Sequence, residues 1–173
     1  MYEIIKSYVQ QVPAVRFIGV KYGDEDRVEG GFGSKWGEWF ANDRFSKLEA
    51  LLTEELRNSY EDADAYLGFM RWKEGEPFQY WIGMFLPEGT DIPEGYDYID
   101  IPEAKLGVVW LQGPEGELYG KECKCAEQIS KDGCEIIQDK EGASLFFERY
   151  GCPRFIEKDE EGRVILDICH YVR

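Results

Sequence analysis

Residues 65–86 read AYLGFMRWKEGEPFQYWIGMFL, and this stretch decides the fold class of the chain. Two runs rich in aromatic and aliphatic residues flank the segment KEGEP, whose glycine and proline are typical of a turn. The pattern predicts a β-hairpin with strands at 65–72 and 78–86. In the second strand, apolar residues occupy both alternating faces, so we expect it near the centre of a sheet. One of these faces carries Phe78, Tyr80, Ile82 and Met84.

The elements around this hairpin predict a unit that occurs twice. The first copy combines a strand, a helix in one or two pieces and the hairpin, at 12–22, 34–58 and 65–86. After a connector rich in proline and glycine, the same order recurs at 103–111, 116–132 and 144–172. We therefore predict an α+β fold made of a duplicated strand-helix-strand-strand unit, with antiparallel sheets and one main helix per half. The alternative is a single α+β sandwich without internal symmetry.

The size of the chain suits one domain. Its 173 residues are enough to bury a real core, and an apolar fraction of 43% argues against disorder. The repeated order of elements predicts two pseudo-repeats within residues 1–173, at about 1–90 and 91–173.

The charge of the chain excludes several classes of partner. The sequence has 20 Lys and Arg against 35 Asp and Glu, which gives a net charge of −15. A surface this acidic repels phosphate groups, so we expect neither direct nucleic-acid binding nor docking on a membrane. The N-terminus lacks the basic start and apolar run of a signal peptide, and no window has the length of a membrane span. We expect a cytoplasmic protein.

Residues that commonly carry catalysis or bind metals are sparse. The sequence contains no nucleophile elbow, P-loop, HExxH or EF-hand pattern. The segment Cys123-Lys124-Cys125 lacks further soft ligands, because His170 is the only histidine. We expect neither a metal nor another cofactor. His170 and Cys169 are neighbours in the last predicted strand, so they point to opposite faces and do not converge as a catalytic pair.

Glu148 is the most informative charged residue. In the segment LFFERY it alternates with Phe146 and Tyr150, so the three side chains project from one face of a predicted inner strand. Either that face is solvent, or a carboxylate lies among aromatic rings. A buried carboxylate is costly unless it is protonated, paired with an arginine or awaiting a cationic or hydrogen-bonding ligand. The arginines considered as partners are Arg16, Arg149 and Arg154.

The aromatic residues form a second set of candidates. The chain has 5 Trp, 11 Tyr and 10 Phe, most of which are expected to fill the core. Flat rings around one carboxylate would suit a planar, lipophilic, cationic guest through stacking and cation–π contacts. Alternatively, Trp36, Trp39 and Phe40 form an exposed patch for a protein partner.

Several segments together resemble the GyrI-like small-molecule-binding family. They are LFFERY at 145–150, DIPEGY at 91–96, the helix stop GCE at 133–135 and the closing LDICHYV at 166–172. The resemblance spans nearly the whole chain. It implies the fold of the effector-binding domains of multidrug-responsive and AraC-type transcription regulators, with a ligand cleft between two halves. One departure is CAEQI at 125–129, where the family has a Trp/Leu/Pro run.

The resemblance also implies a site. The FE-x-Y segment of the family maps onto residues 147–150 and makes Glu148 the carboxylate that meets cationic drugs. The aromatic residues implied as its ligand-binding companions are Trp39, Phe40, Tyr80, Trp110, Phe146, Tyr150 and Tyr171.

Three functions follow as alternatives. The first is a stand-alone protein that binds lipophilic, aromatic, cationic compounds in multidrug sensing, sequestration or resistance. The second rests on stand-alone family members that are hydrolases, which open the cyclopropane rings of DNA-alkylating natural products; Glu148 would then be catalytic. The third is an acidic interaction protein that modulates a topoisomerase or a regulator.

Overall fold

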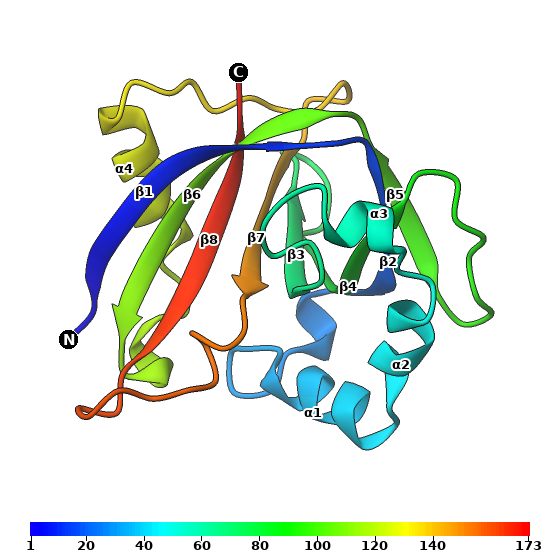
Figure 1. The fold of residues 1–173 in the computed structure, drawn as a ribbon, viewed down its shortest axis with the longest axis horizontal. Helices are drawn as coiled ribbons and strands as arrows, with labels where there is room; N and C mark the ends of the chain where they lie inside the picture. The colour runs from blue at the N-terminus through cyan, green and yellow to red at the C-terminus, as the bar shows by residue number, and fades with distance from the viewer.

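A computed structural model describes residues 1–173 and shows one antiparallel sheet of eight strands with four α-helices (Figure 1). The α+β class is therefore confirmed. The strands are β1 (Glu3–Val12), β2 (Val15–Tyr22), β3 (Tyr66–Trp72), β4 (Gln79–Pro87), β5 (Asp97–Ile101), β6 (Ala104–Gly113), β7 (Ser144–Tyr150) and β8 (Val164–Val172). The helices are α1 (Gly33–Ala41), α2 (Arg44–Glu49), α3 (Glu54–Arg57) and α4 (Glu122–Lys131).

The order of the strands is symmetric about its central pair. The sheet runs β1-β6-β8-β7-β3-β4-β2-β5, so β7 and β3 meet in the middle. Strand β1 precedes β2 along the chain but pairs with β6, whereas β5 precedes β6 but pairs with β2. Each half thus places its leading strand at the edge of the other half. A duplicated unit would produce this arrangement, and a boundary between pseudo-repeats near residue 90 stays a prediction.

Both predicted hairpins are present, as β3–β4 and β7–β8, with ends within one residue of those expected. The helix predicted at 34–58 in one or two pieces forms three short helices. Asp43 adopts a left-handed conformation with a φ of 52° and separates α1 from α2. The predicted helix at 116–132 begins only at Glu122, because a 3-10 turn and Gly120, with a φ of 75°, precede it.

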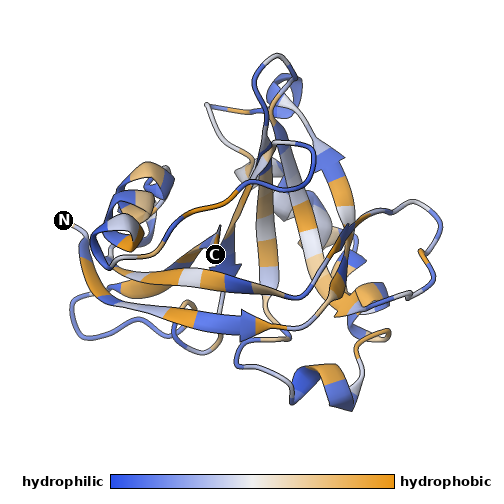
Figure 2. Ribbon diagram, turned by 90° about the horizontal axis from the view of Figure 1, so that it is seen from above, coloured by the Kyte–Doolittle hydropathy of each residue, from blue (hydrophilic) through white to orange (hydrophobic).

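Three of the helices cover one face of the strongly curved sheet, which we call the helix face (Figures 1 and 2). Trp39 of α1 and Phe45 and Leu48 of α2 pack on β2 and β4. Cys125 and Ile129 of α4 pack on β6 and β8. Figure 2 shows hydrophobic and hydrophilic residues alternating along the strands, as expected where the two faces differ. None of the helices has the length and apolar character required to cross a membrane.

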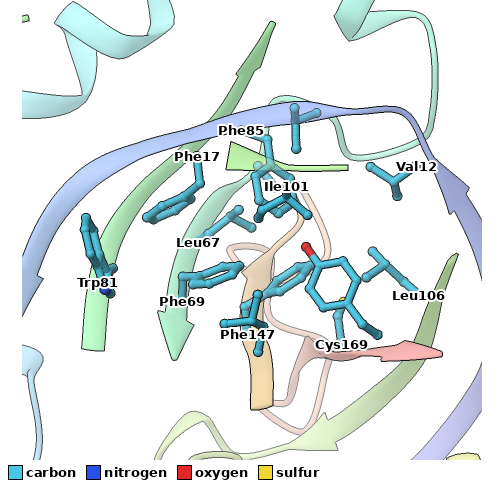
Figure 3. Packing of buried hydrophobic residues seen from close by; sticks show 14 of the residues in the cluster. Val12, Phe17, Leu67, Phe69, Trp81, Phe85, Ile101, Leu106, Phe147 and Cys169 are labelled. Atoms are coloured by element: carbon cyan, nitrogen blue, oxygen red, sulfur yellow. The ribbon is translucent and has the colours of Figure 1, made fainter. Parts of the chain in front are cut away.

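The opposite face, here the inner face, holds the largest core. Strands from both halves contribute to it, and Phe147 of the central strand lies among their side chains (Figure 3). Phe147 stacks against Phe69 with ring centroids 5.6 Å apart and meets Phe85 edge-on at 5.3 Å. Leu56 of α3 closes this core. Packed side chains thus cover both faces of the central strands. Alternate side chains of β7 point to the helix face or into the aromatic core of the inner face.

Candidate functional site

Glu148 lies at the middle of the sheet, on the helix face. In β7 it stands between Gly68 of β3 and Ile168 of β8, at the point where the two halves meet. Only 5% of its surface is exposed. Removing a carboxylate from water to this extent is costly without compensation, so its partners decide what it can do.

A hydrogen-bond chain from three elements ends on this carboxylate. The hydroxyl of Tyr80, in β4, donates to Oε1 of Glu148 at 2.6 Å. The indole Nε1 of Trp36, in α1, donates to the Tyr80 oxygen at 2.9 Å. The chain therefore links α1 across the surface of the sheet to β7.

Aromatic rings surround the same atoms. Phe32 stacks on Tyr80 with ring centroids 4.2 Å apart and planes inclined by 5°. Trp36 meets Tyr150 edge-on, with centroids 4.8 Å apart. Such an apolar environment excludes water and raises the electrostatic cost of a negative charge.

No lysine, arginine or histidine forms an ion pair with Glu148. The three arginines that the sequence offered each pair with aspartate instead: Arg16 with Asp100 at 2.7 Å, Arg149 with Asp167 at 2.9 Å and Arg154 with Asp62 at 2.9 Å. The buried carboxylate therefore has a hydrogen-bond donor but no countercharge.

The protonation of Glu148 reflects this environment. Burial raises its pKa to about 7, and the nearby Glu122 carboxylate acts in the same direction, whereas the hydrogen bond from Tyr80 lowers it. Burial also raises the pKa of Tyr80 well above its ordinary value, so this side chain remains a hydroxyl donor. Near neutral pH, Glu148 thus exists as a mixture of acid and carboxylate.

Three of the aromatic residues proposed as companions share the helix face with Glu148. Tyr80 contacts the carboxylate directly. Tyr150 and Phe146 flank it along β7, and Phe146 stacks on His170 with ring centroids 5.4 Å apart. The structure brings these residues together, and their contact with a ligand stays a prediction.

Two of the predicted companions, in α1, lie apart from Glu148. Trp39 is completely buried beneath the helix and donates from Nε1 to the hydroxyl of Tyr22 at 2.8 Å, so it belongs to the core. Phe40 is 60% exposed and packs at the surface against Tyr66 and Phe45. The helix turns both rings away from Glu148, because only Trp36 among its aromatic residues faces β7.

Trp110 and Tyr171 lie on the inner face, on the other side of the sheet from Glu148. The register of β7 and β8 places Ile168 opposite Glu148, so Tyr171, three positions further on, points to the opposite face. Trp110 pairs with Asp167, which shares the inner face. The structure therefore does not bring these two residues to the carboxylate.

Sequence reasoning missed part of the site. Trp36 is absent from the predicted companions of Glu148 and appears only in the alternative of an exposed patch, although its spacing from Phe40 indicates a helical face. Phe32 follows two glycines and precedes a third, in a stretch with no periodicity to assign it. Gly68 of the first hairpin carries no side chain, so nothing in its pattern indicated a role.

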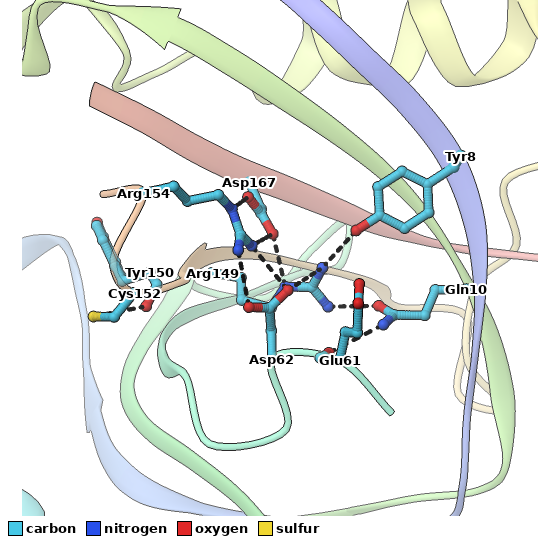
Figure 4. Close-up of polar contacts among 9 residues, drawn as sticks. All are labelled: Tyr8, Gln10, Glu61, Asp62, Arg149, Tyr150, Cys152, Arg154 and Asp167. Atoms are coloured by element: carbon cyan, nitrogen blue, oxygen red, sulfur yellow. Dashed lines mark hydrogen bonds and ion pairs between the residues drawn. The ribbon is translucent and has the colours of Figure 1, made fainter. Parts of the chain in front are cut away.

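A second polar cluster occupies the inner face around Arg149, the residue that follows Glu148 in β7 (Figure 4). Arg149 is 1% exposed and donates to Asp167 at 2.9 Å, to Gln10 at 2.6 Å and to Tyr8 at 3.2 Å. Arg154 binds Asp167 and also forms two hydrogen bonds of 2.9 Å with Asp62. Two arginines and two aspartates therefore form a neutral cluster that ties β1 and the loop before β3 to the central strands.

The symmetric sheet, with three of its four helices on one face, has a fold consistent with that of the GyrI-like effector-binding domains, as the sequence resemblance predicts. No family model matches the chain, and no curated protein matches it. The evidence for the fold is structural.

Three solved structures illustrate the likeness. SAV2435 bound to tetraphenylphosphonium has a TM-score of 0.66 and 18% identity, over 98% of this chain and 94% of that one. A candidate bacterial transcription regulation protein from Staphylococcus aureus MU50 has a TM-score of 0.63 and 18% identity, over 98% and 99%. The C-terminal domain of EcmrR has a TM-score of 0.56 and 10% identity, over 97% of each chain. Identities this low show the fold alone.

Proposed function

We propose that this protein binds lipophilic, aromatic cations at Glu148, in drug sensing, sequestration or resistance. The observation that carries the proposal is a buried carboxylate that lacks a countercharge. A cation at this position would supply the missing charge in an environment where electrostatic attraction is strong. A structure with the same fold, SAV2435, is bound to tetraphenylphosphonium, which is a cation of this kind.

The rings near Glu148 suit such a ligand. Tyr80, Tyr150 and Trp36 present π faces and edges within one cluster. A delocalised cation gains cation–π attraction from these faces and loses little hydration on burial. A small hydrated cation would lose far more hydration energy in the same place, so the site favours large organic cations.

Access to Glu148 requires a movement, because the carboxylate is covered in this structure. Trp36 and Phe32, at the start of α1, lie over Tyr80. Helix α1 has nine residues and no side-chain hydrogen bond at its N-cap. A short helix without a capping side chain is inexpensive to displace, so we expect ligand binding to shift the start of α1.

Calorimetric titration with tetraphenylphosphonium at about pH 8 tests the proposal. Glu148→Gln keeps the shape and the hydrogen bond from Tyr80 but removes the charge. It should weaken binding by about 1–3 kcal/mol, the scale of interactions with a charged group. The matched control is Glu49→Gln, because Glu49 also accepts a hydrogen bond from a tyrosine, Tyr66 at 2.8 Å, but lies at the surface. Equal affinities of wild type and Glu148→Gln would reject the site.

A second candidate is hydrolysis of strained rings at the same residue. A pKa of about 7 allows Glu148 to accept a proton from water near neutral pH, which a general base requires. Incubation with a cyclopropane-bearing alkylating compound would then yield a hydrated product over many turnovers. Binding without turnover would reject this candidate and leave the first intact.

A further inference from the structure

Gly68 leaves the space that the Tyr80 side chain needs. It lies in β3, directly beside Glu148 of β7, while Tyr80 comes from β4 on the other side of β3. A Cβ atom at position 68 would lie 2.4 Å from the Tyr80 hydroxyl and 2.5 Å from Oε1 of Glu148. Both distances are shorter than real contacts, so the absence of a side chain lets Tyr80 cross β3 and reach the carboxylate.

Trp36 fixes the direction in which Tyr80 donates. An indole Nε1–H is a donor only, so the Tyr80 oxygen must accept in its hydrogen bond with Trp36. The single hydroxyl proton of Tyr80 is then directed at Oε1 of Glu148, 2.6 Å away. Glu148 is therefore held as an acceptor at this oxygen, which favours its charged form.

We propose that Gly68 and Trp36 are positioning residues that set the charge preference of the Glu148 site. By aligning Tyr80 toward the carboxylate, they make the site select a cation over a molecule of the same shape with the opposite charge. This inference rests on the proposed function, because it names the residues that give the same site its specificity.

Tyr80 is the main group that lowers the pKa of Glu148, and Tyr150 acts in the same direction to a smaller extent. The titratable side chains that act on the carboxylate are Tyr80 from β4, Tyr150 from β7, Glu122 from α4 and Tyr119 from the segment before α4. None is basic. On the neighbouring strand, His170 contacts the carbonyl of Glu122 at 3.0 Å, and burial lowers its pKa. A displaced Tyr80 would therefore remove the larger of the two contributions that lower the pKa of Glu148, and the effect of burial would raise that pKa further.

Two variants with matched controls test the inference. Gly68→Ala displaces the Tyr80 hydroxyl, and Trp36→Phe removes the indole donor while keeping a ring. The control for the first is Gly107→Ala in β6, in the other half of the sheet, because the atoms nearest to a Cβ there belong to the Ile129 side chain of α4, with the first at 2.9 Å. The control for the second is Trp39→Phe, which removes the α1 indole that bonds to Tyr22.

Two measurements give the readout: the Glu148 carboxyl pKa by carbon-13 NMR without ligand, and the affinity ratio of tetraphenylphosphonium to tetraphenylborate. Gly68→Ala should raise the pKa by about one unit, which lowers the ratio about tenfold near neutral pH. Trp36→Phe should shift both quantities in the same direction by a smaller amount. Both controls should keep the wild-type values.

The inference would be overturned if both variants fold and show the same Glu148 pKa and the same affinity ratio as the wild type. If Gly68→Ala does not fold, Trp36→Phe alone tests the inference, because phenylalanine keeps an aromatic ring at position 36. Should the wild type bind no lipophilic cation, the proposed function fails, and the ligand-free pKa still tests the positioning of Tyr80. An unchanged pKa in that case would overturn the inference as well.

Discussion

Glu148 and Arg149 are consecutive residues of β7 that differ in how their charge is balanced. Both are almost completely buried, on opposite faces of the sheet. Arg149 contacts two aspartates, a glutamine and a tyrosine, within a cluster of two arginines and two aspartates. Glu148 receives one hydrogen bond from Tyr80 and has no cation beside it.

The difference separates a structural cluster from the proposed ligand site. The inner-face cluster is neutral, and its hydrogen bonds hold separate segments of the chain together, so breaking it should cost stability. At the helix-face site an unbalanced charge costs stability, and a bound cation would compensate it. Substitutions at the two positions should therefore act in opposite directions on the free energy of unfolding.

The largest expected effect on stability comes from the neutral inner-face cluster. Arg149→Met leaves the completely buried Asp167 with Arg154 as its remaining partner, so we expect a loss of about 3–5 kcal/mol in the free energy of unfolding. Urea denaturation measures this. The control is Arg16→Met, which breaks the more exposed pair with Asp100 and should cost below about 1 kcal/mol. Equal losses of unfolding free energy in the two variants would show that the inner-face cluster does not stabilise the fold more than a surface ion pair does.

On the unbalanced side, Glu148→Gln should stabilise the ligand-free protein. The folded-state pKa of about 7 lies above the ordinary value of 4.5, so the folded protein holds this proton more tightly than the unfolded chain. The carboxyl group therefore destabilises the fold progressively as pH rises from 4.5 to about 7. We expect a gain of up to about 3 kcal/mol above that range. If the difference in unfolding free energy between variant and wild type does not change with pH, Glu148 does not carry an unbalanced charge in the folded protein.

A smaller effect concerns the pH dependence of binding. Only the carboxylate form attracts a cation, so the affinity for tetraphenylphosphonium should rise about tenfold between about pH 6 and pH 8. Calorimetry at several pH values measures it, and Glu148→Gln should abolish the slope. If the affinity of Glu148→Gln still rises with pH, a group other than Glu148 loses the proton that controls binding.

The smallest effect is expected from a residue on the wrong face. Tyr171→Phe alters the inner core, so the affinity for tetraphenylphosphonium should stay within about twofold of wild type. Fluorescence titration is sufficient to test this. A large loss would mean that the ligand enters the inner face, and the comparison between the two faces would fail.

The alternation of side chains between the two faces of a single strand could be predicted from the sequence. The spacing in LFFERY correctly placed Phe146, Glu148 and Tyr150 on one face, and the turn residues at 73–77 located the first hairpin. These features depend on neighbours in the chain. Strand β1 was missed because an edge strand buries little, so its residues show weak hydrophobic periodicity.

Relations between strands could not be predicted in the same way. Whether Tyr171 shares a face with Glu148 depends on the register of β7 with β8, which one residue of shift would reverse. Likewise, the chain from Trp36 through Tyr80 to Glu148 joins residues separated by 44 and 68 positions. Its existence depends on Gly68, and no local pattern indicates that requirement.

The most direct test of the central claim is a crystal structure of the complex with tetraphenylphosphonium. We predict the phosphonium on the helix face, close to the Glu148 carboxylate, with Trp36 and the start of α1 displaced from Tyr80. A cation bound elsewhere, with the hydrogen bonds of Trp36, Tyr80 and Glu148 intact, would contradict the assignment of Glu148 as the ligand site.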